Sequence, residues 1–125
     1  KGAAQVRSAL DRSKALVALR KCRTFLARGG DRAVFIPLRA EAYNKLGEYA
    51  AARSDAAEAL ALDPGNSATV MQYGIAFLGM NQADSAIVRF YSLPAGPERD
   101  LRLAMAYGMA HRCTEALPLL TALIT

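Results

Sequence analysis

Tryptophan is absent from this 125-residue chain, histidine occurs once and cysteine occurs only twice. Cys22 and Cys113 form neither a CxxC pair nor a Cys/His cluster, so we expect free buried thiols and no metal site. His111 stands beside Cys113 without a third group to orient the pair, which argues against nucleophilic catalysis there. No apolar run approaches the roughly 18 residues that a membrane-spanning helix needs. These absences favour a protein that is not an enzyme, carries no cofactor and does not span a membrane.

Aromatic residues make up only 7% of the chain, yet hydrophobic residues make up 53%. Alanine accounts for the difference, with 26 copies. Alanine has the best intrinsic helix propensity, and its small side chain lets helix backbones approach closely. Because β-branched residues are sparse as well, the composition predicts a single all-α domain.

The net charge of +5 is concentrated near the start of the chain, where residues 1–32 carry +7 and the remainder carries −2. A basic patch is predicted at Arg20, Lys21, Arg23 and Arg28. It could bind phosphates, but no aromatic side chains accompany it for stacking on bases. A solvated surface or an acidic partner is therefore favoured over nucleic acid. A solvated outer face is also expected at Glu48, Asp55, Glu58 and Asp63.

Hydrophobic periodicity predicts a series of helices separated by clear breaks. Two helices are expected within residues 3–28, with Ser13 as the N-cap of the second. That second helix is expected to place Leu16, Leu19, Arg23 and Leu26 on one stripe, with Cys22 and Phe25 beside it. Further helices are expected at residues 34–46, 50–62, 67–80, 84–92, 98–110 and from Thr114 onward.

Capping and breaking residues mark the ends of these helices. Asp31 can cap the helix that follows it, and Gly47 should end that helix. Pro37 is expected in its first turn, where a missing N–H is tolerated. The sequence Asp63-Pro64-Gly65-Asn66 predicts a strong stop.

Comparison of the chain with itself reveals a repeat. Three aromatic residues are each followed nine residues later by an alanine: Tyr43 by Ala52, Phe77 by Ala86 and Tyr107 by Ala116. Four residues beyond those alanines stand Ala56, Phe90 and Leu120. Tyr43 and Phe77 are 34 residues apart, and Phe77 and Tyr107 are 30 apart.

On these residues the chain resembles the tetratricopeptide repeat family, whose pattern is W-x2-L-G-x2-Y, then A-x3-F, then P, over about 34 residues. The strongest match is 33–66, which also carries Pro64 and a joint typical of the family at Lys45–Tyr49. The resemblance implies a right-handed α-solenoid of stacked antiparallel helix pairs. Its units would be a degenerate repeat (1–32), a full repeat (33–66), a shortened repeat (67–96) and a truncated repeat (97–125). The first pattern position is never tryptophan, and Asp100 fills one such apolar position.

In this family the first helix of each repeat lines a concave groove that binds other proteins. The implied groove residues here are Glu41, Asn44, Lys45, Met71, Ile75, Leu78, Leu101, Met105 and Met109. One subgroup clamps a peptide's terminal carboxylate with Lys and Asn, but Pro37, Glu41 and Gln72 stand at those positions, so the clamp is absent. A methionine-rich groove suits an amphipathic helix or an extended apolar peptide. The expected function is therefore a non-catalytic protein-interaction module.

Two other functions stay open. The segment could be a scaffold within a larger enzyme or a secretion or assembly apparatus, with the groove filled in cis or by a second copy of the chain. A chain that begins without methionine and ends on apolar residues is expected to be a fragment of a longer protein. Binding of RNA or phosphate by the basic patch is less favoured. With no signal peptide visible, a cytoplasmic location is favoured.

Overall fold

The computed structural model describes residues 2–12, 14–110, 117–119 and 121. Within these ranges the chain is helical and contains no strand, which confirms the predicted all-α class. The helices are α1 (Gly2–Asp11), α2 (Ala15–Ala27), α3 (Arg32–Lys45), α4 (Tyr49–Leu62), α5 (Ser67–Gly79), α6 (Ala83–Tyr91) and α7 (Pro97–Met109).

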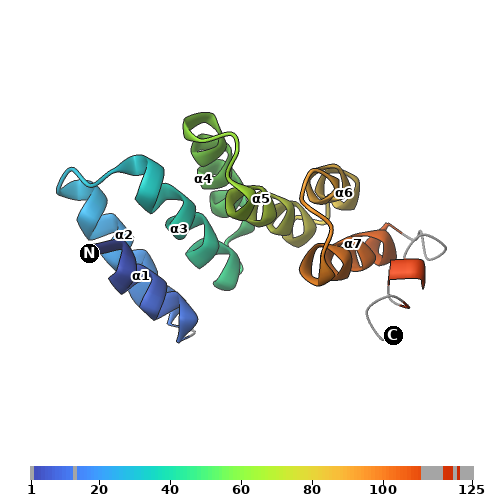
Figure 1. The fold of residues 1–125 in the computed structure, drawn as a ribbon. Coiled ribbons are helices and arrows are strands. Elements are labelled where there is room, and N and C mark those ends of the chain that lie inside the picture. The colour runs from blue at the N-terminus through green and yellow to red at the C-terminus, as the bar shows by residue number, and fades with distance from the viewer. Residues whose placement is uncertain (1, 13, 111–116, 120, 122–125) are drawn as a thin grey trace.

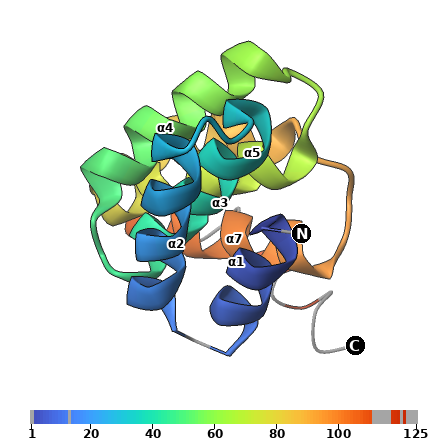
Figure 2. The same cartoon turned by 90° about the vertical axis from the view of Figure 1, so that its left-hand side faces the viewer.

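The helices pack in chain order, each against the next, in a row that runs from α1 and α2 to α7 (Figure 1). Figure 2 looks along this row, with α1 and α2 nearest the viewer. Each odd-numbered helix also contacts the next odd-numbered one, whereas α2, α4 and α6 make no contacts with one another among the described residues. The row therefore has a closely packed layer of odd-numbered helices and a more open layer of even-numbered ones.

The turns that close the two central helix pairs have the same geometry, 34 residues apart. After α3, Glu48 N–H donates to the Tyr43 carbonyl at 2.9 Å, with Gly47 at a φ of +79°. After α5, Gln82 N–H donates to the Phe77 carbonyl at 2.8 Å, with Asn81 at a φ of +60°. These are Schellman motifs, in which a left-handed residue satisfies the last helix carbonyls. Tyr43 and Phe77 thus occupy equivalent places in the structure as well as in the sequence.

Gly74 explains how α5 and α6 come close together. A Cβ atom built at Gly74 would overlap the ring of Phe90, which is fully buried in α6. The corresponding pair in α3 and α4 is Ala40 and Ala56, both fully buried. Both pairs fill the same narrow space between two helices. Gly74 and Phe90 fill it with one large side chain, and Ala40 and Ala56 fill it with two small ones.

The buried apolar side chains gather in two clusters at opposite ends of the row. One lies over α1, α2 and α3 around Val6, Leu10 and Leu19, and the other over α5, α6 and α7 around Phe77, Phe90 and Leu103. Between them α4 contributes small side chains, the buried alanines at 52, 56 and 59. The large side chains therefore fill the ends of the row, and close helix contact holds its middle.

An ion pair joins α3 to α4 beside those alanines. The Arg39 guanidinium donates from Nε and Nη2 to the two carboxylate oxygens of Asp55, at 2.7 and 2.8 Å. This hydrogen bonding raises the pKa of Arg39 above its ordinary value. Asp55 is buried, so its expected place on a solvated outer face is wrong. A bidentate guanidinium–carboxylate pair offsets the desolvation of both groups.

Two further details of the predicted helices are wrong. Leu16 is 52% exposed and Arg23 is exposed, because the buried face of α2 is Ala15, Ala18, Leu19 and Cys22. α3 begins at Arg32, so Pro37 lies inside the helix rather than in its first turn. Since proline has no N–H, the Ala33 carbonyl lacks its usual donor four residues on.

Other predicted boundaries agree with the structure. Asp31 caps α3 by accepting a hydrogen bond from the Ala33 N–H at 3.0 Å. α6 has 9 residues and α4 has 14, so α6 is the shorter helix. The predictions for Ser13, His111 and Cys113 and the predicted start at Thr114 of the last helix fall outside the described residues, whereas residues 117–119 and 121 are helical.

We expect Gly74→Ala to destabilise the fold by about 1–3 kcal/mol, because the added methyl group must displace the buried Phe90 ring. Gly108→Ala is the matched control, since Gly108 is exposed in α7 and an added Cβ meets nothing within 4 Å. That control should gain up to about 1 kcal/mol from helix propensity. Urea unfolding followed by circular dichroism measures both, and equal changes in stability would refute the close-contact explanation.

Cys22 predicts a specific dependence of stability on pH. The thiol is fully buried and unpaired, and desolvation raises its pKa from 9.0 to about 11. Nearby Arg39 opposes this shift, and Asp55 adds to it. Between those pH values the unfolded chain loses the proton while the folded chain keeps it. The stability that the neutral thiol contributes is therefore complete below pH 9 and is lost as the pH rises toward 11.

We expect a Cys113→Ser chain to lose roughly 1–3 kcal/mol more stability between pH 8 and pH 10.5 than the same chain with Cys22→Ala added. Urea unfolding at the two pH values measures the difference. Comparing the two chains removes every contribution to the pH dependence that they share. Identical pH dependence in both would show that Cys22 has the same pKa folded and unfolded.

Candidate functional site

The polar residues of the predicted groove connect neighbouring odd-numbered helices. Glu41 on α3 accepts two hydrogen bonds from the Arg7 guanidinium on α1, at 2.9 and 2.8 Å. This contact raises the pKa of Arg7 above its ordinary value. The Asn44 side-chain amide donates to the backbone carbonyl and to the side chain of Gln72 on α5, at 2.9 and 2.8 Å. Glu41 and Asn44 are thus engaged within the fold and fix the spacing of α1, α3 and α5.

Two other predicted groove residues lie elsewhere. Leu78 is buried in the apolar cluster of α5, α6 and α7, so it offers no surface to a ligand. Lys45 is exposed at the end of α3, beside Lys14 and Leu16 at the start of α2. The groove prediction is therefore wrong for Leu78, and Lys45 belongs to a different surface.

The remaining apolar groove residues lie on α5 and α7. Leu101, Met105 and Met109 recur every four residues along α7 and are 44%, 46% and 40% exposed. We call these three residues the α7 stripe. On α5, Met71 and Ile75 are half-buried and pack against the apolar cluster. α5 and α7 contact each other directly, so both sets belong to the odd-numbered layer.

A cleft opens beside Met71, where the start of α5 meets the connection from α6 to α7. Its volume is about 390 Å³. Its lining residues come from three segments and are Ser67, Ala68, Met71, Gln72, Leu93, Pro94, Gly96, Pro97, Glu98 and Arg99. Arg99 is held there by Asp100 at 3.2 Å and lies over the Tyr91 ring, with 5.8 Å to the ring centroid. The cleft is large enough to accept one side chain of a ligand.

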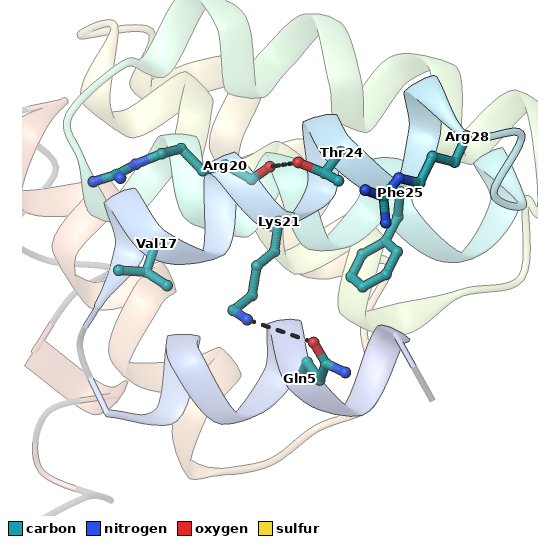
Figure 3. A pocket seen from close by; sticks show the side chains of 7 residues that line it. All are labelled: Gln5, Val17, Arg20, Lys21, Thr24, Phe25 and Arg28. Carbon is teal, nitrogen blue, oxygen red and sulfur yellow. Dashed lines mark hydrogen bonds between the residues drawn. The ribbon is translucent and has the colours of Figure 1, made fainter.

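The predicted basic patch is divided by the structure. Arg20, Lys21 and Arg28 surround one hollow of about 290 Å³ over α1 and α2 (Figure 3). Lys21 reaches from α2 toward α1, where its ammonium group donates a long hydrogen bond of 3.5 Å to Gln5. Arg23 is exposed on the same helix but does not line this hollow.

The concavity around Val17 was not predicted from the sequence. Two further hollows, of about 460 and 520 Å³, adjoin the first and share Val17 with it. Their rims add Arg12, Lys14 and Lys45 to the cations. The sequence feature that could have indicated this basic surface is the run from residue 12 to 28, which holds six cations and no acidic residue. Its hydrophobic periodicity did not reveal that Leu16 is exposed.

The described residues contain no group of three or more His, Cys, Asp or Glu side chains that could hold a metal ion. Among the same residues, no helix is long and apolar enough to cross a membrane. What they do present is two kinds of surface, one apolar and one basic, at opposite ends of the row of helices.

Neither the known protein-family models nor the curated proteins contain a match to this chain.

Proposed function

We propose that this chain is a protein-interaction module of the tetratricopeptide type, a right-handed superhelix, that binds an amphipathic helix of a partner protein through the α7 stripe. The supporting observation is the contrast between the two faces of α7. Leu103, Ala104 and Tyr107 are buried against α6 and α5, whereas the stripe residues are 40–46% exposed.

The spacing of the stripe favours a helical ligand. Leu101 and Met109 are eight positions apart, which is about 12 Å along a helix. The apolar face of a helix of two to three turns presents side chains over the same length. Methionine side chains are flexible and polarizable, so they adapt to ligand side chains of different shapes.

A hydrogen bond and a ring contact fix α7, which carries the stripe, against α6. The Tyr107 hydroxyl donates to the Tyr91 hydroxyl at 2.6 Å, and the two rings pack edge to face across α6 and α7. A surface that is already ordered loses less conformational entropy when a ligand binds. The cleft beside Met71 lies next to the first turn of α7, so a side chain at one end of the ligand helix can enter it.

The alternative is that the stripe is covered by another part of the parent protein or by a second copy of the chain. A partner helix, another part of the parent protein and a second copy would each cover the exposed apolar surface. The three cases therefore differ not in what is covered but in the number and kind of chains in the complex. A stripe filled by a second copy gives a dimer in sedimentation, and the stripe variant below would then be monomeric.

We expect Met105→Glu/Met109→Glu to weaken binding of a helical peptide by at least about tenfold, because carboxylates replace the apolar contact. The peptide is one selected on the wild-type chain from a displayed library of amphipathic helices. Fluorescence anisotropy measures its affinity, and circular dichroism checks the helicity of each variant.

Val88→Glu is the matched control. Val88 is 65% exposed on α6, in the even-numbered layer, so a carboxylate there should change peptide affinity less than about twofold. If the double variant keeps its helicity and still binds at wild-type affinity, the α7 stripe is not the binding surface. Sedimentation of the wild-type chain as a monomer supports a partner helix over a second copy.

A further inference from the structure

We propose that the surface formed by α1, α2 and the end of α3 binds an acidic segment of a partner protein that carries aliphatic side chains between its carboxylates. This surface consists of the three adjoining hollows around Val17, and we call it the basic trough. It lies at the opposite end of the row from the α7 stripe and is independent of the function proposed above.

The first support is uncompensated charge. Six cations lie on the rim of the trough: Arg12, Lys14, Arg20, Lys21, Arg28 and Lys45. None of them forms an ion pair with a described residue, and no acidic residue lines any of the three hollows. Like charges gathered on one surface attract an oppositely charged ligand over a distance of about 8 Å in physiological salt.

Three nearby acidic groups make other contacts. Asp11 pairs with Arg7 at 3.7 Å on the same helix. Asp31, the N-cap of α3, accepts a hydrogen bond from the backbone N–H of Ala33. Glu41 is held by Arg7. These three carboxylates therefore contact groups outside the trough. They do not neutralise its cations, whose positive charge stays available for a ligand.

The second support is the composition of the floor. Val17 is half-buried and is shared by all three hollows. Leu16 and Leu46 line the largest hollow and are 52% and 40% exposed. A floor of aliphatic side chains inside a rim of cations complements a segment in which carboxylates alternate with aliphatic residues.

The same floor argues against nucleic acid. Single-stranded nucleic acid binds basic grooves that also offer aromatic rings for base stacking. The aromatic residue in the trough is Phe25, and its ring already stacks on Phe35, with centroids 5.1 Å apart and planes at 20°. A ligand with carboxylates and aliphatic side chains therefore matches the trough better than one with phosphates and bases.

The test uses a labelled peptide of about twelve residues in which pairs of glutamates alternate with pairs of leucines. Three probes accompany it: a version with glutamine for glutamate, a version with serine for leucine, and a thymidine oligonucleotide of similar length. Fluorescence anisotropy in low salt measures each affinity. We expect the glutamate–leucine peptide to bind most tightly and its affinity to fall as salt is raised.

Arg20→Glu should weaken binding of that peptide by about tenfold, because Arg20 lines two of the three hollows. Arg23→Glu is the matched control, since it makes the same change in net charge on the same helix outside the hollows. It should weaken binding less than about threefold. Leu16→Ser should weaken binding by about threefold to tenfold without any change in charge.

Several results would overturn the proposal. Equal losses in Arg20→Glu and Arg23→Glu would show attraction by net charge alone. Equal binding of the serine version would exclude the aliphatic floor. Tighter binding of the oligonucleotide would assign the trough to nucleic acid, and no binding of the glutamate–leucine peptide would remove the acidic segment as its ligand.

Discussion

The narrow gap between paired helices is the constraint on which the rest of this structure depends. Gly74 leaves room for the Phe90 ring, and Ala40 and Ala56 are fully buried at the equivalent place in the preceding pair. A helix pair this close has no interior of its own, so its remaining apolar face must be covered by the next pair. The row of helices, its two apolar clusters and its two uncovered surfaces all follow from this.

Polar contacts then set the order and spacing of the odd-numbered helices. Arg7 to Glu41 joins α1 to α3, and Asn44 to Gln72 joins α3 to α5. Each contact requires the correct partner at the correct position, which apolar packing alone does not. The first of these contacts also uses a carboxylate, that of Glu41, which could otherwise neutralise another cation. Among the described residues, no cation of α2 forms an ion pair.

The sequence predicted the all-helical class and most helix boundaries because the signals for them were local. Gly47 and Asp31 act within a few residues of themselves, and the 34-residue spacing of Tyr43 and Phe77 reports the repeat directly. It predicted the sites poorly because a site depends on which neighbour covers a residue. Leu78 and Met105 have equally apolar side chains in equivalent helices, but α6 and α7 bury Leu78, while Met105 is 46% exposed. Periodicity alone does not distinguish the two.

The two surfaces differ in the kind of selectivity that they can provide. The α7 stripe is apolar and adaptable, so its affinity depends mainly on contact area and on the fit of methionine side chains. The basic trough attracts ligands over a longer distance and rejects those of like charge, so it contributes to association rate and to the choice of partner. Because α3 and α4 hold the two ends of the row together through close contact and the Arg39–Asp55 pair, a partner that reached both surfaces would bind more tightly than either contact alone allows.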